Sequence, residues 1–493
     1  MSRKVLPLPA DFKWGYATAA YQIEGAVDAD DRGASIWDTF SHLSPTRTKD
    51  AHGDIACDHF NRYQSDIDLM ASYGAKHYRF SLSWSRIIPL GSRNDPINEA
   101  GISFYNKLID GLLEKGIEPW ITLYHWDLPQ ALEDRYGGWL NQEEVQKDFV
   151  RYTSVCFERF GDRVKQWITF NEPYIVAIFG YATGIMAPGR SSTNPSSNGV
   201  GNSATEPWIV GKSLIMSHAL ATEAYNQKFA KTQAGQVTIV LNGYYYEPWD
   251  ADNPQDVEAA QRRLEFYIGW FADPIFLAQN YPASMREQLG SRLPAFTETE
   301  LRILAENKPK WYGMNHYTAK FARAEPSPPA SINFTGNVTE HINNKAGVEI
   351  GPHSGVSWLQ VCPEQFRKLL NWVWNRYGCM IIITENGCPC PGESGMDFAQ
   401  SIEDDFRVKY FELYLDAISK AINDDGVPVG GYFAWSFMDN FEWQNGYDIR
   451  FGVTHVNYDT QERTPRKSAR YLKSTFNERM AANTMARYRN ALL

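Results

Sequence analysis

The feature that most constrains the fold is a joint that recurs along the chain: a helical pattern, a glycine, and then a short apolar run. One instance is Met70–Gly74, which precedes the apolar run Lys76–Leu82. Glycine supplies the left-handed residue that ends many helices, so each joint predicts a helix followed by a strand. Repeated in this way, the joint predicts an α/β fold with a parallel sheet.

Eight apolar runs are candidates for the strands of this sheet. They are Phe12–Thr18, Lys76–Leu82, Trp120–Tyr124, Val164–Phe170, Val237–Asn242, Tyr312–Tyr317, Met380–Thr384 and Tyr432–Trp435. Eight strands that alternate with helices favour a closed (β/α)8 TIM barrel over an open doubly wound sheet. We interpret the long polar stretches Ala187–Pro207 and Ala322–Ser357 as loops that shape a pocket, within a single domain over residues 1–493.

Composition argues against several kinds of partner. A net charge of −10, without a basic run that aromatic residues interrupt, argues against nucleic acid. No apolar run is long enough for a membrane span, and Met1–Pro9 is not followed by the apolar stretch of a signal peptide. We therefore expect a cytoplasmic protein, with no membrane partner, whose six cysteines stay reduced. No metal-binding or nucleotide-binding motif is present, so no cofactor or metal is expected.

Two of the predicted strands lead into a glutamate. Glu172 follows the fourth strand and Glu385 follows the seventh. In a parallel barrel the carboxyl ends of the strands form the rim where chemistry takes place, and these two ends can face one another. Hydrolysis of a glycosidic bond needs one carboxylic acid and one carboxylate on opposite sides of that bond. Either glutamate alone could be an ordinary loop acid, but together they predict a catalytic pair.

The sequence around both glutamates resembles the two signature motifs of glycoside hydrolase family 1. These motifs are Thr169–Pro173, read as TFNEP, and Ile383–Gly387, read as ITENG. Further segments are similar to landmarks of that family in the same order: Ala17–Gly25, Arg79–Trp84, His125–Trp126, Asn315–Tyr317 and Trp435–Trp443. The resemblance covers nearly the whole chain and implies a (β/α)8 barrel with retaining β-glycosidase activity.

The resemblance also implies the roles of individual residues. Glu172 would be the general acid and base, and Glu385 the nucleophile that forms a glycosyl-enzyme intermediate. Arg79 would hold Glu385 ionised by its charge, and Tyr317 would donate a hydrogen bond to the same carboxylate. Glu172 must stay protonated until it acts, and both partial burial and the charge of Glu385 favour that state.

Other residues would bind the sugar, with Asn171 at the 2-hydroxyl and Trp435 stacked under the ring. The remaining expected substrate contacts are Gln22, His125, Trp126, Asn315, Tyr317, Glu442 and Trp443. A carboxylate at Glu442 would repel a phosphorylated sugar, so an unphosphorylated glycoside is expected. Thioglucosidase relatives carry Gln in place of the acid, so Glu172 implies O-glycosides. Tyr174 and Phe179 are expected to line the entrance for the leaving group.

These features predict a retaining β-glucosidase, similar to fungal members of the family. The expected substrates are cellobiose, short cello-oligosaccharides and aryl β-glucosides, with a role in cellulose degradation. One alternative is a β-glycosidase of broader specificity, acting also on galactosides or fucosides. Another, from a different class, is a catalytically silent sugar-binding scaffold. The sequence leaves open the oligomeric state, the preferred leaving group and the pH optimum.

Overall fold

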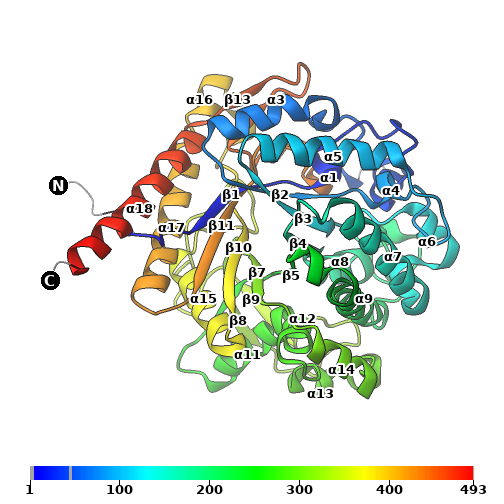
Figure 1. Ribbon diagram of the computed structural model, residues 1–493. Helices are drawn as coiled ribbons and strands as arrows, with labels where there is room; N and C mark the ends of the chain where they lie inside the picture. Colours follow the sequence, from blue (N-terminus) through cyan, green and yellow to red (C-terminus); the bar gives the residue numbers. More distant parts are fainter. Residues whose placement is uncertain (1–4, 44–46, 492–493) are drawn as a thin grey trace.

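A closed barrel of parallel strands forms the centre of the computed structural model, which describes residues 5–43 and 47–491 (Figure 1). Neighbouring strands follow one another in chain order, and the last pairs with the first. The eight strands are β1 (Lys13–Ala17), β2 (His77–Ser81), β3 (Glu118–Tyr124), β4 (Gln166–Asn171), β5 (Gln236–Asn242), β7 (Trp311–Asn315), β10 (Met380–Asn386) and β11 (Val429–Trp435). The predicted TIM barrel and all eight predicted strands are confirmed. Both ends of the predicted domain, and the first residues used to predict the cellular location, lie outside the described residues.

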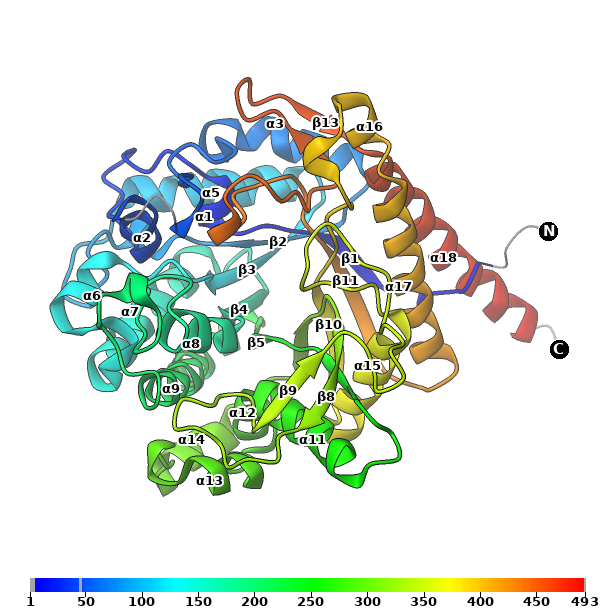
Figure 2. The ribbon, with the colours of Figure 1, turned by 180° about the vertical axis from the view of Figure 1, so that it is seen from behind.

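Helices surround the barrel on the outside (Figures 1 and 2). The long ones are α3 (His59–Ser72), α5 (Glu99–Glu114), α7 (Gln142–Phe160), α9 (Glu206–Lys228), α11 (Pro254–Leu264), α15 (Pro363–Tyr377), α17 (Asp405–Asn423) and α18 (Lys467–Ala491). Their ends follow local sequence signals. The side chain of Asn98 accepts a hydrogen bond from the Ala100 amide at the start of α5. Gly74, with φ of 78°, supplies the left-handed residue after α3.

Side chains fill the interior of the barrel. At the amino-terminal ends of the strands, the ring of Trp120 lies 5.3 Å from that of Trp311 and 5.0 Å from that of Phe433, measured between centroids. All three rings are buried. The interior at this end is therefore packed, and it leaves space for a ligand only toward the carboxyl ends of the strands.

One predicted loop contains a strand. Within the stretch Ala322–Ser357, residues Val338–His341 form β9, which pairs antiparallel with β8 (Ala319–Ala324). With β6 (Tyr245–Pro248) they make a small three-stranded sheet outside the barrel. Val338 and Thr339 are β-branched and suit a strand. The glycine and asparagine directly before them are typical of turns, so the sequence was interpreted as a loop.

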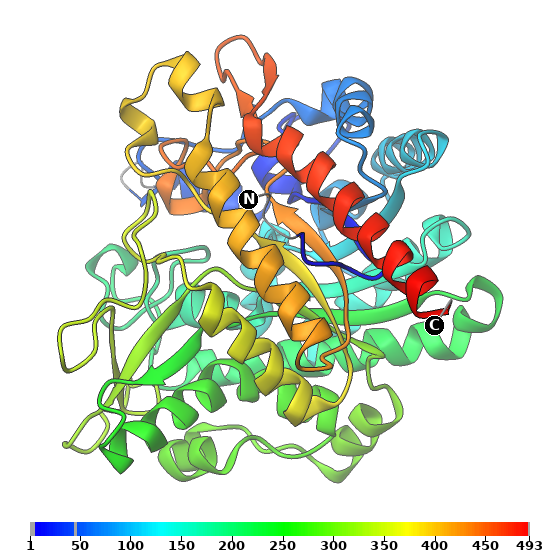
Figure 3. The same cartoon turned by 90° about the vertical axis from the view of Figure 1, so that its left-hand side faces the viewer.

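The ends of the described chain lie on the same side of the barrel (Figure 3). There α15, α17 and α18 run side by side, and the amide of Leu8 donates to the carbonyl of Arg479 at 3.1 Å. No helix among the described residues is long and apolar enough to cross a lipid bilayer. All six cysteines are free in this structure.

Candidate active site

A cavity of about 280 Å³ lies at the carboxyl ends of the barrel strands. Its wall includes both predicted catalytic glutamates. It also includes most of the predicted sugar contacts, namely His125, Trp126, Asn315, Tyr317, Trp435, Glu442 and Trp443. These residues therefore lie around one cavity, although they come from distant parts of the chain.

Glu172 occupies the junction between β4 and the short helix α8 (Pro173–Tyr181). Its backbone is left-handed, with φ of 49°, and only 6% of the residue is exposed. One carboxyl oxygen accepts a hydrogen bond from the side-chain amide of Asn315 at 2.6 Å. Burial, and then the charge of Glu385, raise the pKa of Glu172 to about 8. At neutral pH this side chain is therefore a carboxylic acid, as its predicted role requires.

Glu385 lies near the end of β10, paired in register with Asn315 of β7. Its two carboxylate oxygens accept separate hydrogen bonds, one from Arg79 and one from the hydroxyl of Tyr317, each at 2.7 Å. Both predicted neighbours are thus in place. Burial raises the pKa of Glu385, while the charge of Arg79 and the bond from Tyr317 oppose that rise. The prediction that Arg79 keeps Glu385 ionised therefore described only part of the balance, because it left out burial.

Arg79 connects the two halves of the site. Its buried guanidinium donates to Glu385 and also, at 2.6 Å, to the side-chain oxygen of Asn171. Asn171 precedes Glu172, so a single planar group fixes the distance between the ends of β4 and β10. Asn315 adds a second link, because its amide nitrogen donates to both Asn171 and Glu172.

Four polar atoms of residues that line the cavity have no hydrogen-bond partner among the described residues: Nδ1 of His125, Oδ1 of Asn242, Oε2 of Glu442 and Oε1 of Gln444. Oε1 of the predicted contact Gln22 is also unpaired, but Gln22 lies outside the set of lining residues. All these atoms are buried, where an unpaired polar group is costly. Burial lowers the pKa of His125 well below its ordinary value, so the ring is neutral. Burial, and then the charge of Glu385, raise the pKa of Glu442 to about 8. Such atoms suit the hydroxyls of a sugar, which can both donate and accept.

Two predicted contacts differ in detail from the expectation. The indole N–H of Trp126 donates to the backbone oxygen of Asn171 at 2.9 Å, so Trp126 offers the cavity its ring and not a hydrogen bond. Tyr174 was expected at the entrance together with Phe179. Phe179 does line the cavity, but the buried hydroxyl of Tyr174 accepts a bond from Arg263 at 3.1 Å instead.

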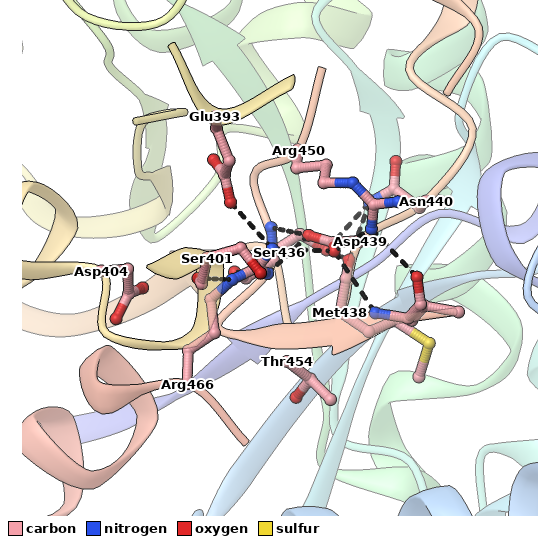
Figure 4. A network of polar contacts seen from close by, with 12 residues as sticks. Glu393, Ser401, Asp404, Ser436, Met438, Asp439, Asn440, Arg450, Thr454 and Arg466 are labelled. Carbon is pink, nitrogen blue, oxygen red and sulfur yellow. Dashed lines mark hydrogen bonds and ion pairs between the residues drawn. The ribbon is translucent and has the colours of Figure 1, made fainter. Parts of the chain in front are cut away.

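A buried ionic network supports the segment that carries Glu442 and Trp443 (Figure 4). Both carboxylate oxygens of Asp439 accept from Arg466, at 2.7 and 3.0 Å, and one also accepts from Arg450 at 2.6 Å. Burial alone would raise the pKa of Asp439, but the charges of Arg466 and Arg450 lower it to about 2. Asp439 is therefore ionised at any ordinary pH and anchors this segment from behind the cavity.

The apolar part of the cavity wall left little signal in the sequence. It consists of Ile175, Ile185, Met186, Tyr244, Tyr267, Trp358 and Phe451, beside the predicted Phe179. Ile185, Met186 and Trp358 directly flank the two long stretches that we expected to shape the pocket. The predicted bounds of those stretches were therefore slightly too narrow to include them. Tyr244 and Trp358 stack with their centroids 6.4 Å apart. They form an aromatic surface beyond the carboxylates.

Comparison with known proteins gives one consistent result. A family model described as glycosyl hydrolase family 1 matches residues 5–480. Beta-glucosidase 1B of Phanerodontia chrysosporium is 53% identical over 95% of this chain and 85% of its own length. The crystal structure of a GH1 β-glucosidase from Humicola insolens, in complex with glucose, has a TM-score of 0.94 and 51% identity, and covers 96% of this chain and 99% of its own. A rice β-glucosidase variant in a covalent complex with glucose has a TM-score of 0.91 and 42% identity, and covers 95% and 98%.

Proposed function

The chain belongs to glycosyl hydrolase family 1 and is a retaining β-glucosidase, and we propose that Glu172 is its general acid and base and Glu385 its nucleophile. The observation that carries the assignment is the contrast between the two buried carboxyls. Glu172 meets a neutral amide, whereas Glu385 meets an arginine and a tyrosine hydroxyl. The proton shared by such a pair belongs on Glu172.

In the first step Glu172 gives its proton to the oxygen of the leaving group. An oxygen of Glu385 attacks the anomeric carbon, the glycosidic bond breaks, and a glycosyl-enzyme ester forms. The negative charge on Glu385 disappears in this ester. Since that charge is one cause of the raised pKa of Glu172, the pKa falls when the ester forms. Glu172 is then ionised and removes a proton from the water that cleaves the ester, which restores both carboxyls.

The sugar would be held by the polar atoms that lack protein partners. Gln22 and Glu442 would accept bonds from sugar hydroxyls, and His125 would donate one. Trp435, which is only 4% exposed, would lie under the ring, and Asn171 would meet the 2-hydroxyl. No Lys or Arg occurs among the described residues that line the cavity, which favours an unphosphorylated sugar.

The proposal includes finer points of substrate and setting. We propose cellobiose, short cello-oligosaccharides and aryl β-glucosides as substrates, because the aromatic wall beyond the carboxylates suits a second sugar or an aryl group. Turnover of cellobiose would fit a role in cellulose degradation. The free cysteines fit the reducing cytoplasm. A single catalytic domain over residues 1–493 is supported by a barrel that the first and last strands close together.

The test of this function is the stereochemistry of the product. Purified protein is expected to hydrolyse p-nitrophenyl β-glucoside and to leave p-nitrophenyl α-glucoside intact. Proton NMR during the first minutes should show β-glucose before mutarotation produces the α-anomer. First formation of α-glucose would contradict retention, and no turnover would favour a silent sugar-binding scaffold. The β-galactoside and β-fucoside measured alongside would report the breadth of specificity.

The pH dependence follows from the proton on Glu172. The value of kcat/KM is expected to fall above about pH 8, because free Glu172 then loses the proton that it must donate. In Glu385→Gln the neighbouring charge is absent, so the pKa of Glu172 should move downward. The ¹³C NMR titration of labelled glutamate would measure this shift. Glu442→Gln is the matched control and should give a smaller downward shift, since Glu442 contributes least among the causes. An unchanged pKa in Glu385→Gln would contradict the proposed coupling.

Glu442 is expected to contribute to binding in both the ground state and the transition state. Glu442→Ala should lower kcat/KM for p-nitrophenyl β-glucoside by roughly 10- to 100-fold, because the sugar hydroxyl that it binds would be left buried without a partner. The folded state should persist, because Asp439 and its arginines anchor the segment independently. Circular dichroism would confirm the fold, and kinetics with wild-type values would remove Glu442 from the sugar-binding set.

A further inference from the structure

Two histidines and an aspartate meet on the surface, away from the catalytic cavity. His42 lies in the last turn of α2 (Ile36–Leu43), and His52 and Asp54 lie in the segment that follows. Nε2 of His42 and Nδ1 of His52 are each 3.1 Å from Oδ2 of Asp54. The two imidazole rings stack with centroids 4.8 Å apart. One ligand atom from each residue lies within 4.8 Å of the other two.

The orientation of His42 is fixed from its other side. Its Nδ1 lies 2.7 Å from the backbone oxygen of Asp38. A carbonyl oxygen only accepts, so Nδ1 carries the proton and the neutral ring turns the lone pair of Nε2 toward Asp54. A lone pair facing a carboxylate oxygen is stabilised only by a cation between them, either a proton or a metal ion. Metal-binding histidines commonly hold their second nitrogen against a carbonyl in this way.

The distances fit a metal ion. Bonds of about 2.0 to 2.1 Å place two ligands that are 3.1 Å apart at an angle of about 95 to 100°, close to tetrahedral or octahedral values. The separation of the two imidazole nitrogens is at most 4.8 Å, and two such bonds span roughly 4.2 Å at most. Both imidazoles are about half exposed, at 49% and 46% of the side chain, so either can move inward to close any excess distance.

The surroundings are electrostatically favourable for a cation. A surface hollow of about 290 Å³ is lined by Asp28, Asp38, His42 and Asp54. The one arginine in its wall, Arg32, is paired with Asp38 at 2.9 Å. Oδ1 of Asp38 and Oδ1 of Asp54 are buried and have no hydrogen-bond partner within the described chain. Carboxylate oxygens without partners attract a cation.

We propose that His42, His52 and Asp54 form a surface site for a divalent transition-metal ion of the Zn²⁺ type. Two imidazoles and one carboxylate suit Zn²⁺, Co²⁺, Ni²⁺ or Cu²⁺, whereas Mg²⁺ and Ca²⁺ prefer oxygen ligands alone. The site is separate from the chemistry of hydrolysis, for which no metal is expected. Sequence motifs did not reveal it because the fold of α2 and the next segment brings the ligands together.

The ion would fasten the segment around His52 to α2. This segment already contacts the wall of the catalytic cavity. The amide of Gly53 donates to the hydroxyl of Tyr21 at 3.3 Å, and the ring of Tyr21 stacks on Trp443 with centroids 6.3 Å apart. The hydroxyl of Tyr447 donates to the backbone oxygen of His52 at 2.7 Å. A bound ion is therefore expected to stabilise the folded protein as a whole.

The test is a Zn²⁺ titration of chelator-treated full-length protein by calorimetry. Wild type is expected to bind one ion with saturation, and His42→Ala and His52→Ala should each weaken binding by about tenfold or more. His353→Ala is the matched control, because His353 is equally exposed at 48% and pairs with Glu349 away from the cluster. It should bind as wild type does. No saturable binding by wild type, or equal affinity in all four proteins, would overturn the proposal.

Two further measurements separate ligation from loss of fold. In the absence of metal, both cluster variants should retain wild-type hydrolysis of p-nitrophenyl β-glucoside, since neither histidine lines the catalytic cavity. With Cu²⁺ bound, electron paramagnetic resonance should show nitrogen coupling from two imidazoles in wild type and one in His52→Ala. The same spectrum in both proteins would overturn the assignment of His52 as a ligand. Zn²⁺ should raise the Tm of wild type and of His353→Ala only.

Discussion

Glu385→Gly is expected to lose hydrolysis of β-glucosides by about 10⁴-fold or more, since the covalent step has no nucleophile left. Removal of this side chain also opens a space at the anomeric carbon. Added azide or formate should enter that space and attack an activated glucoside such as 2,4-dinitrophenyl β-glucoside. Dinitrophenolate leaves as the new bond forms, so with azide the product should be α-glucosyl azide, of inverted configuration.

The control for this rescue is Glu385→Gln. It removes the nucleophile but fills the same space, so azide should restore little activity to it. Proton NMR identifies the anomer formed by the glycine variant. β-Glucosyl azide from Glu385→Gly, or efficient rescue of the glutamine variant, would contradict the role of Glu385 as nucleophile.

Glu172→Gln is expected to separate the two halves of the reaction. Without a proton donor, cleavage of glucosides with poor leaving groups should slow by about 10²- to 10⁴-fold, the usual contribution of general acid catalysis. Dinitrophenolate needs no proton, so 2,4-dinitrophenyl β-glucoside should still glycosylate Glu385. The water step then lacks its base, and the glycosyl-enzyme should accumulate, visible as a burst of dinitrophenolate and as added mass on the intact protein.

Azide provides the matched readout for this variant. It needs no base and should release the accumulated glycosyl-enzyme as β-glucosyl azide, with retained configuration. The two variants thus yield opposite anomers from one substrate. A burst in Glu385→Gly and inversion in Glu172→Gln would reverse the two roles, whereas equal losses on good and poor leaving groups would remove Glu172 as the acid.

The sequence predicted the barrel because its signals are local. A glycine such as Gly74 ends the helix that directly precedes it, and an apolar run such as Ile381–Ile383 itself forms the strand. Each signal can therefore be recognised from a few neighbouring residues. The two carboxylates were also found this way, since each follows a recognisable strand. The small sheet was missed because a glycine and an asparagine directly precede β9, and because β6 pairs with β8 from a distant part of the chain.

The remaining differences at the site have the same origin. The indole N–H of Trp126 donates to Asn171, and the hydroxyl of Tyr174 accepts from Arg263. Both partners are distant in the sequence and come close only in the folded chain. The upward shift in the pKa of Glu385 depends on burial, which a motif does not reveal. Trp358 joins the cavity wall through the path of a long loop, which sequence patterns do not specify.

The closure of the barrel by β1 and β11 has a consequence for synthesis on the ribosome. Residues 13–17 are synthesised long before their hydrogen-bonding partners at 431–435. Throughout that interval the nascent chain carries an unpaired strand edge, a surface prone to association with other chains. Arg466, which anchors Asp439, emerges later still. Premature termination before that point would yield polypeptides that chaperones and proteases must remove, and no partly active enzyme.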